Sequence, residues 1–112
     1  MNDIYKKRFL ELHDQMEAII ASKKNVYSEF LGSTQIEIEG TVLLEWKIKA
    51  KSLLNKTCGK DSEHYEAFTQ NENSSLYGTN LDTLRQLKAI FMAAREDYEG
   101  GYLKSTRSLI QA

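Results

Sequence analysis

The sequence contains no proline, one cysteine and two histidines among its 112 residues. Without proline, no position is barred from a helix interior by a missing backbone N–H group. The single cysteine, Cys58, excludes an intramolecular disulfide and a cysteine-rich metal site, and a small apolar role is expected for it. We therefore expect no metal ion and no cofactor.

Long apolar runs and an excess of one charge are also missing. No stretch approaches the roughly 20 apolar residues that cross a bilayer, and the start MNDIYKKRF lacks the apolar segment of a secretion signal. The net charge of −1 gives no general attraction to nucleic acid or to anionic membranes. The expected setting is the cytoplasm, with no membrane contact.

Three stretches have apolar residues spaced alternately three and four apart, which places each set on one stripe of an α-helix. The stripes are Tyr5-Phe9-Leu12-Met16-Ile19, Leu43-Trp46-Ala50-Leu53 and Leu84-Leu87-Phe91-Ala94-Tyr98. The length corresponds to a single domain, residues 1–112. The predicted fold is all-α, a small antiparallel helical bundle of three long helices plus one or two short ones.

The first helix is predicted over residues 2–31, with Asn2 or Asp3 as its cap. Its weak point is 22–25, where a break would fall, and Gly32 would end it in the left-handed conformation.

Residues 33–40 fit two structures. The segment Gln35-Ile36-Glu37-Ile38-Glu39 alternates like a strand, but we find no second strand pattern to pair with it. Thr34 and Glu37 also fit a capping box. We therefore expect a second helix from about Thr34 to Cys58, closed by Gly59.

The second half of the chain alternates between short and long elements. Asp61 is expected to cap a short helix that turns His64, Tyr65 and Phe68 inward, and a polar surface loop follows over 69–79. Thr79 or Asn80 would cap a helix over 81–99, interrupted by Gly100-Gly101. A last helical segment is expected over 102–111.

Two parts of the chain resemble the N-terminal helical region of a widespread family of uncharacterised bacterial proteins. The first part consists of Trp46-Lys47-Ile48-Lys49-Ala50, Leu53-Leu54 and GKDSEHY at 59–65. The second part consists of Leu87-Lys88-Ala89-Ile90, EDYEGGYL at 96–103 and SLIQA at 108–112. The resemblance covers about 41–112. It implies a HEPN-like or abortive-infection-associated helical domain downstream, or a stand-alone version, and a context of phage defence. It assigns no chemical role to any residue.

The leading hypothesis is a non-enzymatic protein-interaction or assembly module, because apolar stripes are present and no catalytic constellation is. The expected partners are a second copy, in a homodimer, or a downstream helical effector domain. The side chains expected at the interface are Tyr5, Phe9, Leu12, Met16, Trp46, Tyr98, Tyr102, Leu103, Leu109 and Ile110.

An alternative hypothesis is a metal-independent ribonuclease. Arg8 and His13 have the R-x4-H spacing of HEPN ribonucleases, in which the two side chains act on an RNA phosphate at a dimer interface. Phe9 stands where that motif has a polar group, and the motif usually lies on a late helix. The ordinary interpretation is that Arg8 and His13 are solvated residues beside the core stripe.

Three further features have a functional and an ordinary interpretation. His64 lacks a second histidine or cysteine at ligand spacing, which favours a structural role over metal binding. A weak nucleic-acid surface would use the lysines of the second helix and its end, which are Lys47, Lys49, Lys51, Lys56 and Lys60. Helical spacing separates Lys47 and Lys51 from the other three, so the positive charge is spread over two faces and nucleic acid is not the expected partner. Glu96, Asp97 and Glu99 oppose the dipole of a helix that ends there, which predicts a continuing helix or a nearby basic group. Gly100-Gly101 would then be a hinge, a packing corner or a docking surface.

Overall fold

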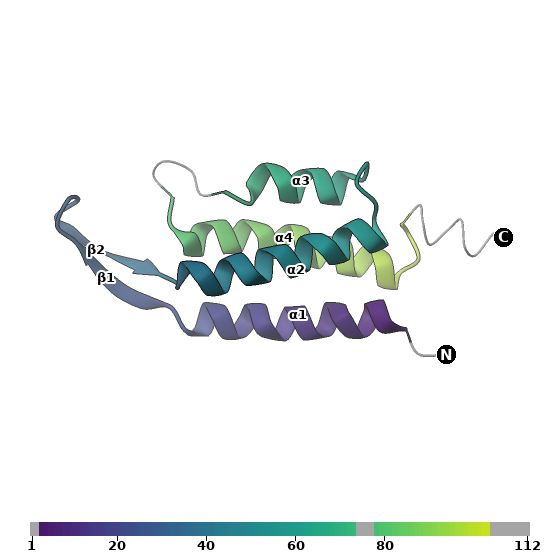
Figure 1. Ribbon diagram of the computed structural model, residues 1–112, viewed down its shortest axis with the longest axis horizontal. Helices are drawn as coiled ribbons and strands as arrows, with labels where there is room; N and C mark the ends of the chain where they lie inside the picture. Colours follow the sequence, from purple (N-terminus) through teal and green to yellow (C-terminus); the bar gives the residue numbers. More distant parts are fainter. Residues whose placement is uncertain (1–2, 74–77, 104–112) are drawn as a thin grey trace.

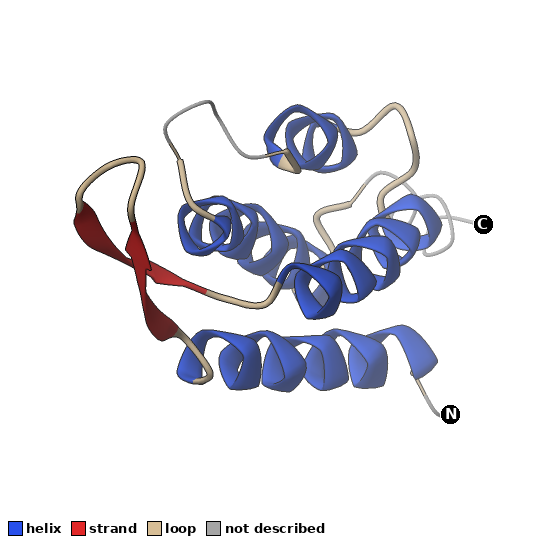
Figure 2. Ribbon diagram, turned by 60° about the vertical axis from the view of Figure 1, so that its left-hand side comes forward, coloured by secondary structure: helices blue, strands red, loops and turns tan. Residues whose placement is uncertain are grey.

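A computed structural model describes residues 3–73 and 78–103. The element order is α1 (Ile4–Ala21), β1 (Lys24–Ser28), β2 (Ser33–Glu37), α2 (Gly40–Thr57), α3 (Glu63–Asn71) and α4 (Asn80–Glu99). Successive helices run in opposite directions, and α2 and α4 lie between α1 and α3 (Figures 1 and 2). The chain is therefore mostly helical, as predicted.

The prediction of a purely helical fold is wrong, because β1 and β2 form an antiparallel hairpin with Val26 opposite Gln35 and Tyr27 opposite Thr34. The first helix ends at Ala21 and not near residue 31, and Ser22 Oγ donates to the carbonyl of Ile19 at its end. The strand-like segment after Thr34 pairs with residues 24–28, which the apolar spacing places in the first helix.

The second helix consequently begins later than predicted. Its cap is Glu39, whose carboxylate accepts hydrogen bonds from the backbone N–H groups of Thr41 (2.9 Å) and Val42 (2.8 Å). These bonds hold the pKa of Glu39 below its usual range. The helix ends as predicted, with Gly59 following it at φ 91° and donating to the carbonyl of Asn55.

The other predicted boundaries are close to those in the structure. The short helix α3 is capped by Ser62, one residue after the predicted Asp61. Thr79 caps α4 in a capping box with Asp82, and α4 ends at Glu99. The predicted cap Asn2 and most of the predicted segment 102–111 lie outside the described residues.

The core is formed by the predicted stripes and is rich in aromatic rings. Trp46 packs between Phe68 and Phe91, with ring centroids 6.2 and 5.5 Å away, and Phe9 lies 5.4 Å from Phe91. The indole Nε1 of Trp46 donates to the carbonyl of Leu12 at 2.9 Å. Because the hydrogen bond and the ring contacts join all four helices, Trp46 is the centre of the bundle.

Candidate protein-interaction surface

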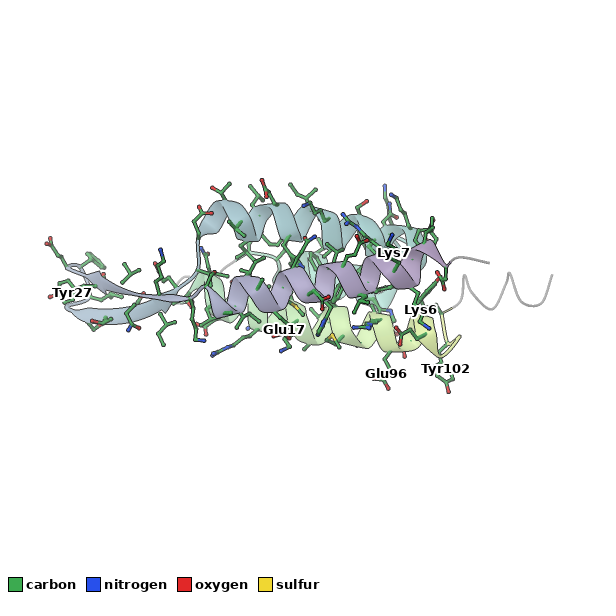
Figure 3. The ribbon with its side chains drawn as sticks, turned by 90° about the horizontal axis from the view of Figure 1, so that it is seen from below. Lys6, Lys7, Glu17, Tyr27, Glu96 and Tyr102 are labelled. Atoms are coloured by element: carbon green, nitrogen blue, oxygen red, sulfur yellow. The ribbon has the colours of Figure 1, made fainter. Side chains whose placement is uncertain are left out.

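The β1–β2 hairpin, residues 24–37, extends away from the bundle and is here called the arm (Figure 1). The molecule is 59 Å long but only 25 by 19 Å in its other dimensions. Figure 3 shows Tyr27 near the end of the arm, far from the helices. The arm therefore presents its outer end to the surroundings on all sides.

Three large apolar side chains are exposed at this outer end. Tyr27, Phe30 and Leu31, here called the arm tip, are 63%, 96% and 55% exposed. Moving aromatic and aliphatic side chains out of water lowers the free energy by about 25 cal/mol for each Å² of apolar surface that is buried. Because these side chains are mostly exposed in this chain, most of that stabilisation is still available to contact with another molecule.

Two hydrogen bonds to Ser28 close the turn between the strands. Ser28 accepts two hydrogen bonds, one at its carbonyl from the N–H of Gly32 (2.8 Å) and one at its hydroxyl from the N–H of Leu31 (3.2 Å). Gly32 has φ 65°, in the left-handed region that favours glycine. Gly32 thus closes a four-residue hairpin loop, and not the helix end that we predicted.

The arm is anchored to the bundle only at its base. Ile38, directly after β2, is buried, and its carbonyl accepts a hydrogen bond from Asn80 Nδ2 of α4 at 3.3 Å. No third strand pairs with the hairpin in the described part of the chain. A two-stranded hairpin is marginally stable in water, so the base fixes its direction while the outer part has little support.

A second exposed feature is a groove of about 540 Å³ between the first half of α1 and the second half of α2, here called the α1–α2 groove. Its apolar lining includes Ile4, 66% exposed, and Ile48, 62% exposed. Its basic lining residues are Lys7, Arg8, Lys49 and Lys56, and its one acidic lining residue is Glu11. The groove is thus apolar and positively charged.

The lysines of α2 divide between two faces, as their helical spacing predicted. Lys47 Nζ donates to the carbonyl of Glu72 at 2.9 Å, and Lys51 Nζ lies 3.0 Å from the carboxylate of the same residue. Lys49 and Lys56 instead line the α1–α2 groove, while Lys60 lies beyond the end of α2. The basic residues near the groove therefore come from two helices, which the spacing within one helix did not reveal.

The structure does not bring Arg8 and His13 together within one chain. Five residues apart on a helix, their side chains point about 140° apart. Arg8 lines the α1–α2 groove, whereas His13 lies 3.6 Å from Glu17, which pairs with Lys88 of α4 at 3.0 Å. Figure 3 shows the same division on α1, with Lys7 toward α2 and Glu17 toward α4.

His64 of α3 contacts the acidic end of α4. His64 Nε2 lies 2.8 Å from Asp97 Oδ2, which links α3 to α4. Arg95 Nε lies 3.2 Å from Glu99. The helix ends at Glu99 and does not continue, and His64 and Arg95 are basic residues that lie near its acidic end, where His64 has a structural partner in Asp97.

Gly100-Gly101 form a packed helix end. The N–H of Gly101 donates to the carbonyl of Tyr98, and the N–H of Tyr102 donates to that of Asp97, the hydrogen-bond pattern of a Schellman motif. The Tyr102 side chain is exposed, whereas Leu103 is buried.

Most of the predicted interface side chains have a place inside one chain. Phe9, Leu12, Met16 and Trp46 are fully or almost fully buried in the core, so they are not available on the surface of this chain. Leu109 and Ile110 lie outside the described residues.

Tyr5 and Tyr98 pack edge to face beside this core, with ring centroids 6.3 Å apart. The Tyr98 hydroxyl donates to the carboxylate of Asp3 at 2.8 Å, and the N–H of Lys6 donates to the same oxygen at 3.0 Å. The hydrogen bond from the N–H of Lys6, and after it the bond from the Tyr98 hydroxyl, lowers the pKa of Asp3. Burial, and after it the hydrogen bond to Asp3, raises the pKa of Tyr98 to about 12. Tyr98 therefore has a role in closing the start of α1 onto α4.

Two observations concern the reactive groups of the described residues. Burial raises the pKa of the Cys58 thiol, which disfavours the thiolate that a nucleophilic cysteine needs. Within 3–73 and 78–103, no three His, Cys, Asp or Glu side chains gather as metal ligands would.

The arm tip did not emerge from the sequence, because Tyr27 and Phe30 lie within residues 2–31, which the spacing predicts as one helix. The sequence does contain a hairpin signal. Two five-residue segments, 24–28 and 33–37, flank the loop Glu29-Phe30-Leu31-Gly32, which ends in a glycine.

None of the helices in the described part of the chain is both long and apolar enough to cross a bilayer. No family model matches the chain, and no curated protein or solved structure matches it either. The resemblance described above therefore stays a prediction.

Proposed function

We propose that this chain is a non-enzymatic protein-interaction module whose arm tip binds another protein chain. The observation that carries the proposal is the exposure of Tyr27, Phe30 and Leu31 at the end of a projecting hairpin. Phe30 and Leu31 lie in the four-residue turn, Tyr27 lies next to it in β1, and the base of the arm is tied to α4.

Protein interfaces support this interpretation. Tyrosine, tryptophan and phenylalanine are enriched in the buried centres of protein interfaces, and the residues that contribute most binding free energy lie in well-packed pockets of the interface. Phe30 is suited to that role because its ring is almost completely exposed and no side chain of its own chain has to be displaced.

The proposed setting is bacterial and cytoplasmic, where the single cysteine, Cys58, would stay reduced. The partner class is protein, either a second copy of the chain or a helical effector domain. The effector domain and the link to phage defence rest on the resemblance alone.

The proposal can be tested by site-specific photo-crosslinking inside cells. A photoreactive phenylalanine analogue at position 30 should give discrete protein adducts on irradiation. The same analogue at Lys60, an exposed position beyond the end of α2, is the matched control and should give none. Position 30 giving no adduct above the control would contradict the proposal, as would His13-dependent cleavage of RNA by the purified protein.

A further inference from the structure

The basic residues of the α1–α2 groove lack acidic partners for most of their charge. Lys7, Lys49 and Lys56 form no ion pair with any carboxylate in the described part of the chain. Arg8 lies 3.9 Å from Glu11, a long contact between two partly exposed side chains that contributes little. A ligand of this groove should therefore bring negative charge.

The same groove also offers apolar surface. Ile4 and Ile48 are among the more exposed large apolar side chains of the helices, and both line it. A nucleic-acid backbone would use the lysines but leave these isoleucines without apolar contacts. An occupant with large apolar side chains next to a carboxylate makes use of both.

The arm supplies that combination. Glu29, Phe30 and Leu31 are consecutive in the hairpin loop, all three are exposed, and Glu29 forms no ion pair within the described residues. Phe30 and Leu31 match the isoleucine lining, and the carboxylate of Glu29 matches the lysines. A groove of about 540 Å³ is within the ~300–1,000 Å³ range of sites that enclose a small ligand, a size suited to two side chains.

The arm of the same chain does not reach the groove. The arm lies between the end of α1 and the start of α2, whereas the groove is lined by the start of α1 and the end of α2. Figure 1 shows these regions at opposite ends of the molecule. A second copy turned end for end places its arm at the groove of the first copy and receives the first arm in its own groove. This arrangement has two-fold symmetry and closes at two subunits.

We propose that the α1–α2 groove binds the Glu29-Phe30-Leu31 loop of a second copy, in a symmetric dimer that exchanges arms. This inference deepens the proposed function, on which it rests, by naming the partner and its receptor surface. Each dimer contains two identical arm–groove contacts.

The test is a solution mass measurement by analytical ultracentrifugation over a range of concentrations. The wild-type chain should shift from its 12.9 kDa monomer to twice that mass as concentration rises. Phe30→Glu, an arm variant, and Ile48→Glu, a groove variant, should each weaken dimerisation at least tenfold. Leu44→Glu is the matched control for the groove, because Leu44 is 52% exposed on the same helix but does not line the groove.

Mixing the two defective variants separates arm–groove contact from the other ways of forming a dimer. The Ile48→Glu chain keeps an intact arm, and the Phe30→Glu chain keeps an intact groove. A mixture should therefore form a heterodimer, through one restored contact, under conditions in which each variant alone is monomeric. Dimers formed by arm–arm or groove–groove contact would not recover on mixing, and that result would overturn the inference.

A charge exchange gives a second measurement that does not depend on the apolar residues. Glu29→Lys alone should weaken the dimer, and adding Lys49→Glu to the same chain should restore part of the affinity. Far-ultraviolet circular dichroism confirms folding of each variant.

Three further outcomes would overturn the inference. They are a wild-type chain that stays monomeric at every concentration, a Leu44→Glu variant that dissociates as much as Ile48→Glu, and oligonucleotide binding that is lost in Lys49→Glu but kept in Phe30→Glu. A monomeric chain that still forms adducts with other proteins from position 30 would leave the proposed function standing, so the two failures can be told apart.

Discussion

The helical bundle and the arm contain the same kinds of large apolar side chain but place them in opposite surroundings. Phe9, Phe68 and Phe91 are fully buried among the helices, whereas Phe30 is 96% exposed at the arm tip. Phe9 packs against Phe91, and Trp46 packs against Phe68 and Phe91, so the burial of these rings stabilises the fold. Phe30 gives the fold almost no such stabilisation, so its apolar surface is available for contact with another molecule.

The support of the two regions differs in the same way. Helices in the bundle bury a stripe against two or more neighbours. Among the described residues, the strands of the arm pair with each other and meet the bundle through contacts between β2 and α4 and through the anchor at Ile38. Substitutions of similar size should therefore have large effects on stability in the bundle and small effects in the arm.

The largest effect is expected at Trp46. Trp46→Ala removes the ring that joins Phe68 to Phe91 and the hydrogen bond to Leu12, and should lower the free energy of unfolding by about 3–5 kcal/mol. Urea unfolding followed by circular dichroism measures the loss. Trp46→Phe, which keeps an aromatic ring, should lose less. A loss below about 1 kcal/mol would show that Trp46 is not the centre of the bundle.

A medium effect is expected at the start of α1. Asp3→Ala removes the acceptor for the N–H groups of Tyr5 and Lys6 and for the Tyr98 hydroxyl, and should cost about 1 kcal/mol of unfolding free energy. Asp3→Asn should retain most of the stability, because asparagine also caps helices. Equal losses in the two variants would contradict the capping role.

A smaller effect should depend on pH through Tyr98. The pKa of Tyr98 in the folded chain is about 12, above the ordinary tyrosine value of 10.0, so the folded state favours the protonated phenol. That stabilisation is present below pH 10 and is lost as the pH rises from 10 toward 12. The lowered pKa of Asp3 has the opposite sign, and its stabilisation is lost as the pH falls below about 4.

Thermal unfolding of wild type and Tyr98→Phe between pH 8 and 12 checks the alkaline prediction. Because lysines titrate in the same range in both proteins, the informative quantity is the difference in stability between them. That difference should shrink as the pH approaches 12, and a constant difference would count against it.

The smallest effect is expected at the arm tip. Phe30→Ser should change the free energy of unfolding by less than about 0.5 kcal/mol, because the side chain is exposed. Phe68→Ser, in the bundle, is the comparison and should cost several times more. Urea unfolding at concentrations that keep the chain monomeric gives both values. A loss above about 1 kcal/mol for Phe30→Ser would mean that the ring packs against its own chain.

Much of the bundle could be predicted from the sequence, because the apolar spacing of residues such as Leu12, Trp46 and Phe91 records which face of each helix is buried. Capping residues also predicted where helices begin and end, as Thr79 does for the start of α4 and Gly59 for the end of α2. These signals are local, and the contacts that they predict lie within or between regular helices.

The arm could not be predicted in the same way, because a hairpin depends on pairing between two segments. Val26 and Phe30 continue the helical spacing of α1, so the same residues fit a helix and a strand with its turn. The groove was missed for a related reason, since Lys7 and Lys49 are brought together only by the packing of α1 on α2.

The most direct measurement is fluorine NMR of the protein labelled with fluorophenylalanine at all four phenylalanines. In dilute buffer, Phe9, Phe68 and Phe91 should give dispersed signals and Phe30 a signal close to that of the free amino acid. At high concentration, or inside cells that express the protein, the Phe30 signal should shift and broaden while the other three stay in place. A Phe30 signal that is already shifted in the dilute monomer, or that stays at the free position under every condition, would contradict a docking role for the arm.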